Sequence, residues 1–191
     1  MIRRIEDYQS LAMRTSTEGH DRAENGCLGL IGESGEIVDA VKKWRFQSGD
    51  NPPVPVDKLI DECGDVLWYC AELAEGLDAD MAELYRRFSE GFYMDLHPLN
   101  VVSPLPLLAV HLANAAMRPY SELYASPETI PDGWRVSQAK CVIVGIMVTV
   151  KDILELHCSS TLEDAMQRNI DKLKRRYPDG FDPERSLHRV E

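Results

Sequence analysis

The fold is decided by residues 57–77, which read DKLIDECGDVLWYCAELAEGL. Their apolar members recur at intervals of three and four, the period of an α-helix with one buried face. These members are Leu59, Ile60, Cys63, Val66, Leu67, Cys70, Leu73, Ala74 and Leu77. Asp57 follows the proline-rich loop 49–55 and is expected to cap this helix at its N-terminus.

A helical period also runs through most of the rest of the chain, and no segment shows the alternation of a β-strand. A first helix is expected from Ile5 to the Thr15-Ser16-Thr17 cluster, and Pro119 is expected to close the fifth. The other helices are predicted at about 23–44, 79–94, 104–118, 136–158 and 161–177. The predicted class is therefore all-α, an antiparallel helical bundle.

The composition excludes several functions. The net charge of −11 opposes binding to the phosphate backbone of nucleic acids. The five cysteines form no CxxC pair, as expected of buried thiols in a reducing compartment. The N-terminus has no signal-peptide pattern, and the most apolar run, 141–150, is too short to cross a membrane. We therefore expect a cytoplasmic protein that binds neither nucleic acid nor membrane.

Four acidic residues stand at the edges of two predicted buried helix faces. Glu33 and Glu36 are three residues apart on one helix, and Glu62 and Asp65 repeat this spacing on the next. If the two helices pack antiparallel, the four carboxylates converge, and a multivalent cation relieves their repulsion. Oxygen ligands without His or Cys favour Mg²⁺, with Mn²⁺ as the alternative. The competing interpretation is an acidic, solvated surface.

A row of glycines accompanies the first acidic pair. Gly26, Gly29, Gly32 and Gly35 recur every third residue, and each costs a helix interior about 0.8 to 1.0 kcal/mol relative to Ala. The close approach of a neighbouring helix, or of a ligand, would offset that cost. Gly64, between Glu62 and Asp65, suits the same explanation.

These motifs resemble those of a known family. Residues 28–39, Lys42-Lys43 and residues 61–69 are similar to the ExxE and ExxD motifs of MazG-like all-α nucleoside triphosphate pyrophosphohydrolases. The 25 residues between Glu36 and Glu62 suit the loop that separates these motifs in that family. Tyr8-Gln9 resembles the family's N-terminal segment, and residues 162–181 resemble the closing helix of short, phage-type members.

The resemblance implies cleavage of a nucleoside triphosphate into a monophosphate and pyrophosphate. Glu33, Glu36, Glu62 and Asp65 would then bind the metal ions that bridge to the phosphates. Either Glu33 or Glu36 would orient or deprotonate the attacking water. The sequence does not indicate which base or sugar of the nucleotide this protein would prefer.

Further residues are candidates for binding the substrate. Lys43 and the basic helix that holds Lys172, Arg175 and Arg176 can bind the leaving pyrophosphate, or can simply complement the helix dipoles. Tyr69 suits stacking on a base and equally suits the core. Gln9 and Asn169 are implied as nucleotide-binding residues by the resemblance alone.

A similarity between the two halves suggests how the chain is organised. Residues 86–92, RRFSEGF, recur as residues 175–181, RRYPDGF, displaced by 89 positions. We expect a unit at 1–95 that carries the acidic site and a second helical unit at 96–191, joined by one core. The second unit is either a degenerate copy or an insertion over 78–159. The protein is accordingly expected to be a pseudo-dimeric monomer or a homo-oligomer.

Two other functions fit the same residues less well. A non-catalytic helical module could retain the acids for a structural cation while it senses nucleotides or binds a protein. A di-iron carboxylate bundle is disfavoured because it needs Glu-x-x-His on two helices, and neither acidic motif has His in that place.

Overall fold

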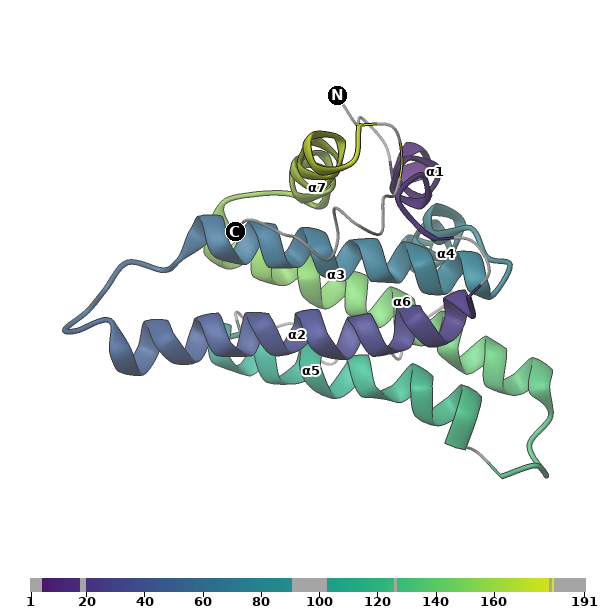
Figure 1. Ribbon diagram of the computed structural model, residues 1–191. Helices are drawn as coiled ribbons and strands as arrows, with labels where there is room; N and C mark the ends of the chain where they lie inside the picture. The colour runs from purple at the N-terminus through teal and green to yellow at the C-terminus, as the bar shows by residue number, and fades with distance from the viewer. Residues whose placement is uncertain (1–4, 18–19, 91–102, 126, 179, 181–191) are drawn as a thin grey trace.

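The computed structural model describes residues 5–17, 20–90, 103–125, 127–178 and 180, and every regular element among them is helical (Figure 1). The helices are α1 Tyr8–Met13, α2 Arg22–Gln47, α3 Val56–Gly76, α4 Met81–Ser89, α5 Leu105–Tyr120, α6 Asp132–Ile153 and α7 Leu162–Arg176. A 3-10 turn, Ile5–Asp7, precedes α1, and π-helical turns Ser121–Ala125 and Leu154–Cys158 extend α5 and α6. The predicted all-α class is confirmed.

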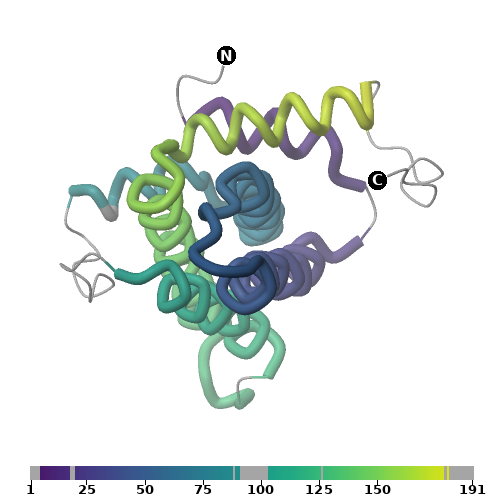
Figure 2. The backbone as a smooth tube through the Cα atoms, turned by 90° about the vertical axis from the view of Figure 1, so that its left-hand side faces the viewer, coloured from purple at the N-terminus to yellow at the C-terminus, as the bar shows by residue number. Residues whose placement is uncertain are grey.

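Four long helices form the body of the molecule. The α2–α3 hairpin packs against α5 and α6, and Figure 2 shows the four helices nearly end-on as a bundle. The helices α1 and α7 lie side by side and cross over α3 on the face away from α5 (Figure 1). Between α1 and α2, the side chains of Thr15, Ser16 and His20 form hydrogen bonds with side chains of α3.

A single cluster of buried apolar residues joins all seven helices. Leu30, Leu67, Leu112 and Ile143 are fully buried members from α2, α3, α5 and α6. The second half of the chain thus supplies much of the support for the α2–α3 hairpin. In addition, α4 packs against α6 while α7 packs against α3.

The predicted duplication stays a prediction. Arg86-Arg87 and Arg175-Arg176 do occupy the last turns of α4 and α7. Residues 91–92, 179 and 181 of the repeated motif lie outside the described residues.

Two residues that were predicted to mark helix ends do not do so. Pro55, rather than Asp57, occupies the N-cap position of α3, and Asp57 lies in the first turn, where its charge favours the helix dipole. Pro119 does not close α5 but is buried inside it. Because Pro119 lies near the helix end, its missing N–H removes one hydrogen bond there while its ring adds to the packing.

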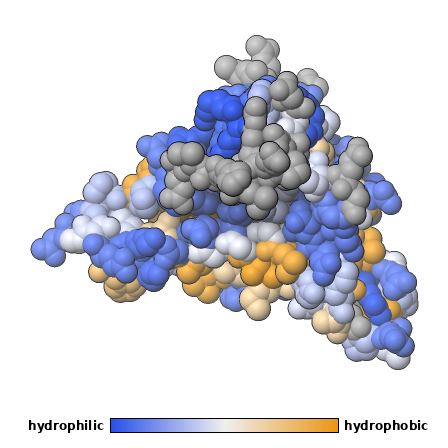
Figure 3. All heavy atoms as spheres, viewed as in Figure 1, coloured by the Kyte–Doolittle hydropathy of each residue, from blue (hydrophilic) through white to orange (hydrophobic). Residues whose placement is uncertain are grey.

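The surface carries apolar side chains along one edge of the bundle. Leu28 and Ile31 of α2 and Leu107, Val110 and Met117 of α5 are exposed, and apolar residues gather at the level of these two helices in Figure 3. Among the described helices, none is both long and apolar enough to cross a membrane.

Candidate active site

Three of the four predicted carboxylates converge between α2 and α3. Glu33, Glu62 and Asp65 each place a carboxylate oxygen within 4.8 Å of the others, and we call them the acidic triad. They meet because each pair stands at three-residue spacing at the edge of a face by which the antiparallel helices pack. Glu62 is only 6% exposed, so its charge is poorly solvated.

The crowding of the triad changes its proton affinity. Burial, followed by the charges of Asp65 and Glu62, raises the pKa of Glu33 from 4.5 to about 7. A carboxylate with such neighbours gains from a cation that neutralises the site.

Two lysines provide positive charge next to the triad. Lys58 forms an ion pair with Glu62 one turn further along α3. Lys172 of α7 forms an ion pair with Asp65, and only 15% of its side chain is exposed. The triad therefore has a lysine ammonium group on each side. Its ligand atoms are all carboxylate oxygens, which fit a hard divalent ion such as Mg²⁺ or Mn²⁺.

A buried hydrogen-bond chain fixes Asp65. Asn169 of α7 donates from Nδ2 to Asp65 Oδ1 at 2.8 Å, and its Oδ1 accepts from the hydroxyl of Tyr8 at 2.9 Å. The same hydroxyl lies 3.3 Å from the carbonyl oxygen of Gly64. Burial, followed by the charge of Asp65, raises the pKa of Tyr8 well above its ordinary value, so its proton stays in place as a donor.

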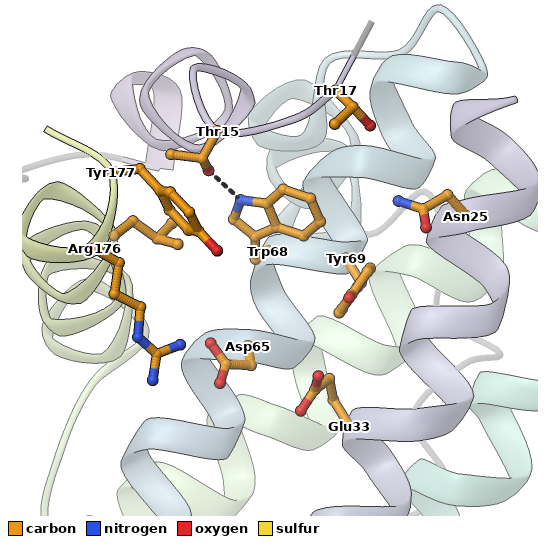
Figure 4. A pocket seen from close by; sticks show the side chains of 10 residues that line it. Thr15, Thr17, Asn25, Glu33, Asp65, Trp68, Tyr69, Arg176 and Tyr177 are labelled. Atoms are coloured by element: carbon orange, nitrogen blue, oxygen red, sulfur yellow. Dashed lines mark hydrogen bonds between the residues drawn. The ribbon is translucent and has the colours of Figure 1, made fainter. Parts of the chain in front are cut away.

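A cavity of about 260 Å³, the first cavity, opens beside the triad (Figure 4). Its lining residues are Thr15, Thr17, Asn25, Glu33, Asp65, Trp68, Tyr69, Leu173, Arg176 and Tyr177. In Figure 4 the carboxylates lie at one end, and Thr17 and Asn25 lie at the other. A negatively charged end and a neutral, partly aromatic end suit a ligand with unlike ends.

The aromatic wall of this cavity has a defined geometry. The rings of Trp68 and Tyr69 meet edge to face, with centroids 4.9 Å apart. The indole N–H of Trp68 donates to Thr15 Oγ1 at 3.1 Å and to the carbonyl of Ala12 at 3.1 Å. A Cβ at Gly29 would lie 2.1 Å from the ring of Tyr69, so only glycine admits this ring position.

A buried carboxylate organises the polar end of the first cavity. Glu72 is 0% exposed, and its Oε1 accepts from Ser16 Oγ at 3.0 Å, His20 Nε2 at 2.8 Å and Asn25 Nδ2 at 3.3 Å. His20 Nδ1 in turn lies 2.7 Å from Thr17 Oγ1. We call these five residues the Glu72 cluster. The second carboxylate oxygen of Glu72, Oε2, has no hydrogen-bond partner among the described residues.

Glu36 lies apart from the triad. It is exposed on α2 and lines a second cavity of about 230 Å³ together with Asp39, Lys43, Trp44 and Lys58. The second cavity adjoins the triad through the Lys58–Glu62 ion pair. Lys43 also pairs with Asp39 at 2.6 Å.

The remaining candidate residues fall into different places. Arg176 lines the first cavity, whereas Arg175 is exposed and lines neither cavity. Gln9 lies at the junction of α3 and α4: its amide donates to Glu75 Oε2 at 2.8 Å and accepts from the backbone N–H of Met81 at 2.9 Å. Both ends of that amide are thus used within the fold.

Several lining residues were missed from the sequence. Lys58 had a usable signal, because it stands four residues before Glu62 on the same helix. Thr17 and Asn25 gave no such signal, since their place depends on how the segment before α2 folds back on α3. Trp68 is more typical of a packing residue, so its sequence position favoured the core.

Close packing explains some of the glycines near the acidic residues but not all of them. A Cβ at Gly26 would lie 2.7 Å from the backbone of Leu73, and one at Gly64 would lie 3.0 Å from Asn169 Cβ. Together with Gly29, these residues confirm the predicted close approach. Gly32 and Gly35 have nothing within 4 Å of an added Cβ, so no neighbour in the described fold requires them.

Comparison with known proteins agrees with the motifs. Residues 23–90 match the family model of the MazG nucleotide pyrophosphohydrolase domain, a segment that includes the whole acidic triad. This confirms the resemblance to the MazG-like family for that part of the chain.

A curated relative is of phage origin. The chain is 43% identical over 61 residues to the Gene 37 protein of Mycobacterium phage L5, an alignment that covers 31% of this chain and 54% of that protein. The chain thus spans about half the length of this relative. No solved structure matches the chain.

Proposed function

We propose that this protein is a metal-dependent nucleoside triphosphate pyrophosphohydrolase, which cleaves a triphosphate to a monophosphate and pyrophosphate. The observation that carries the proposal is the convergence of Glu33, Glu62 and Asp65 beside a cavity whose far end is neutral and partly aromatic. The match of residues 23–90 to the MazG domain supports the same reaction class.

The acidic triad would hold the metal, Mg²⁺ or Mn²⁺, with Glu36 as a further ligand on the side of the second cavity. When bound, such an ion neutralises phosphate charge and makes a bound water more acidic. Glu33 reaches into the first cavity, so it is proposed to orient the attacking water, whereas Glu36 faces the lysines. Asn169 holds Asp65 in place for this role.

The two cavities suggest the orientation in which the substrate would bind. The nucleoside would lie in the first cavity, against Tyr69 and Trp68, with its triphosphate running over the triad. The leaving pyrophosphate would then reach the second cavity, where Lys43 and Lys58 supply positive charge. Lys172, which pairs with Asp65, and Arg176, which lines the first cavity, would contact the phosphates nearer the nucleoside.

A nucleotide panel assayed for pyrophosphate against orthophosphate, with Mg²⁺ or with EDTA, tests the proposal. The variants Glu33→Gln, Glu62→Gln and Asp65→Asn are expected to lose activity by about 10² to 10³, because each removes a charge that the metal requires. Glu128→Gln, an exposed acid far from the triad in sequence, is the matched control and should keep full activity. A nucleotide sensor without catalysis would instead bind Mg²⁺ and nucleotide and release no pyrophosphate.

A further inference from the structure

We propose that the polar end of the first cavity selects bases that carry an exocyclic amino group over bases with a carbonyl at the same position. This inference rests on the proposed function, because it assumes that the first cavity holds the nucleoside. It is carried by the Glu72 cluster, which fixes the direction of the polar groups that face the cavity.

The first step concerns Asn25. An ionised carboxylate only accepts hydrogen bonds, and three donors converge on Glu72 Oε1. The amide of Asn25 must therefore turn its NH₂ toward Glu72. Its carbonyl oxygen is then the atom left for a ligand, so Asn25 offers the cavity an acceptor.

The second step concerns Thr17. We assign His20 as the neutral tautomer that donates from Nε2 to the carboxylate of Glu72, so that its other nitrogen, Nδ1, is an acceptor. The hydroxyl of Thr17 then donates its one hydrogen bond to His20 Nδ1, which lies 2.7 Å away. Thr17 then offers the cavity lone pairs, which makes it a second acceptor.

The third step compares this pattern with the edges of the bases. The N4 amino group of cytosine and the N6 amino group of adenine are donors, whereas O4 of thymine or uracil is an acceptor. An amino group would satisfy the acceptors at Asn25 and Thr17. A carbonyl would face them with no proton to share, and an unpaired buried acceptor is costly. The pattern therefore favours an amino group over a carbonyl at C4 of a pyrimidine or C6 of a purine.

Tyr69 offers a stacking surface for the base in the same cavity. Its ring lies against Gly29, one helical turn after Asn25 on α2, and both residues line the same cavity. A base stacked on this ring would direct an edge at the polar end in Figure 4. The phosphates would then lie at the opposite end of the cavity, beside the carboxylates that would hold the metal.

Two matched substrate pairs test the proposal. The triphosphates of deoxycytidine and deoxyuridine differ at the C4 substituent and its ring tautomer, and those of deoxyadenosine and deoxyinosine differ likewise at C6. We expect kcat/KM to favour the amino member of at least one pair by about tenfold or more. Binding of the corresponding monophosphates, measured by calorimetry, should show the same order.

Two variants probe the residues themselves. Asn25→Ala removes the acceptor, and Glu72→Leu removes the group that orients it. Glu72 touches no base in this scheme and acts as a positioning residue, so a loss of discrimination in Glu72→Leu reports orientation. In both variants the ratio of kcat/KM within the preferred pair should fall markedly toward one. Asn114→Ala, at an exposed position on α5, is the control and should keep the ratio.

The outcomes separate the two proposals. Equal turnover within both pairs, or a preference that Asn25→Ala leaves unchanged, overturns the base readout while pyrophosphate release still supports the proposed function. Preferential binding of the amino monophosphates without any hydrolysis supports the readout and overturns the proposed function. If neither hydrolysis nor selective binding is found, both proposals are wrong.

Discussion

Asn169 donates a hydrogen bond of 2.8 Å to Asp65, although the two residues are 104 positions apart. Asn169 is 3% exposed, and its other amide atom accepts from Tyr8 of α1. Three helices, α1, α3 and α7, therefore meet at one carboxylate of the acidic triad. The closing helix positions the site as well as covering it.

Gly64 should be intolerant of a side chain because α7 lies directly on it. A Cβ there would lie 3.0 Å from Asn169 Cβ and 3.1 Å from the carbonyl oxygen of Ala165, a backbone atom that cannot rotate away. Gly64→Ala is expected to lower the free energy of unfolding by about 1 to 3 kcal/mol, as overpacking does. Urea unfolding of the metal-free protein measures this change.

Gly32→Ala is the matched control for that experiment. Nothing lies within 4 Å of an added Cβ at Gly32, so the substitution should raise the free energy of unfolding by about 0.5 to 1 kcal/mol through higher helix propensity. Equal effects of the two substitutions would contradict the packing of α7 described above.

Metal-free stability should depend on pH through Glu33. Its pKa is raised to about 7 in the folded state from 4.5, so between those values the folded protein holds a proton that the unfolded chain has lost. This contribution to stability is therefore lost as pH rises from about 4.5 to 7, and stays lost above that range. Glu33→Gln has no carboxyl group to ionise. As pH rises from about 4.5 to 7, its free energy of unfolding should therefore come to exceed that of the wild type by about 2 kcal/mol more than at low pH.

Thermal melts in EDTA at pH 5, 6, 7 and 8 follow this difference, with Glu128→Gln as the control. Parallel curves for the wild type and Glu33→Gln would mean that Glu33 is not crowded by the other carboxylates.

Lys172 should compete with metal for Asp65. Its ammonium is paired with this carboxylate and is largely buried, so a divalent cation that binds the triad has to displace it or share the carboxylate. In Lys172→Met we expect the Kd of Mn²⁺, measured by calorimetry without nucleotide, to fall about fivefold. The KM for the triphosphate should rise in the same variant, because a phosphate contact is lost. An unchanged Kd for Mn²⁺ would count against this competition.

Much of the fold followed from periodicity. The stretch 57–77 gave α3 to within about one residue of its observed ends, because its apolar period is unbroken. Helix ends were harder, as Asp57 and Pro119 show. Asp57 pairs with Arg168 of α7 from the first turn of α3 instead of capping that helix, and Pro119 is buried inside α5 instead of ending it.

The site was predictable where its residues share a helix face. The spacing of Glu62 and Asp65 and of Glu33 on the facing helix led directly to the acidic triad. Glu36 shares the spacing, but it is exposed and lines the second cavity rather than joining the triad. The Glu72 cluster could not be foreseen, since a glutamate within an apolar helix face has no partner until the segment before α2 is placed.

Phosphorus NMR of the products that form from a nucleoside triphosphate and Mg²⁺ decides whether this protein is a pyrophosphohydrolase. We expect equal amounts of nucleoside monophosphate and pyrophosphate, no nucleoside diphosphate, and no reaction for Glu62→Gln or in EDTA. A diphosphate with orthophosphate as the products, or turnover that Glu62→Gln leaves intact, would contradict the proposed function.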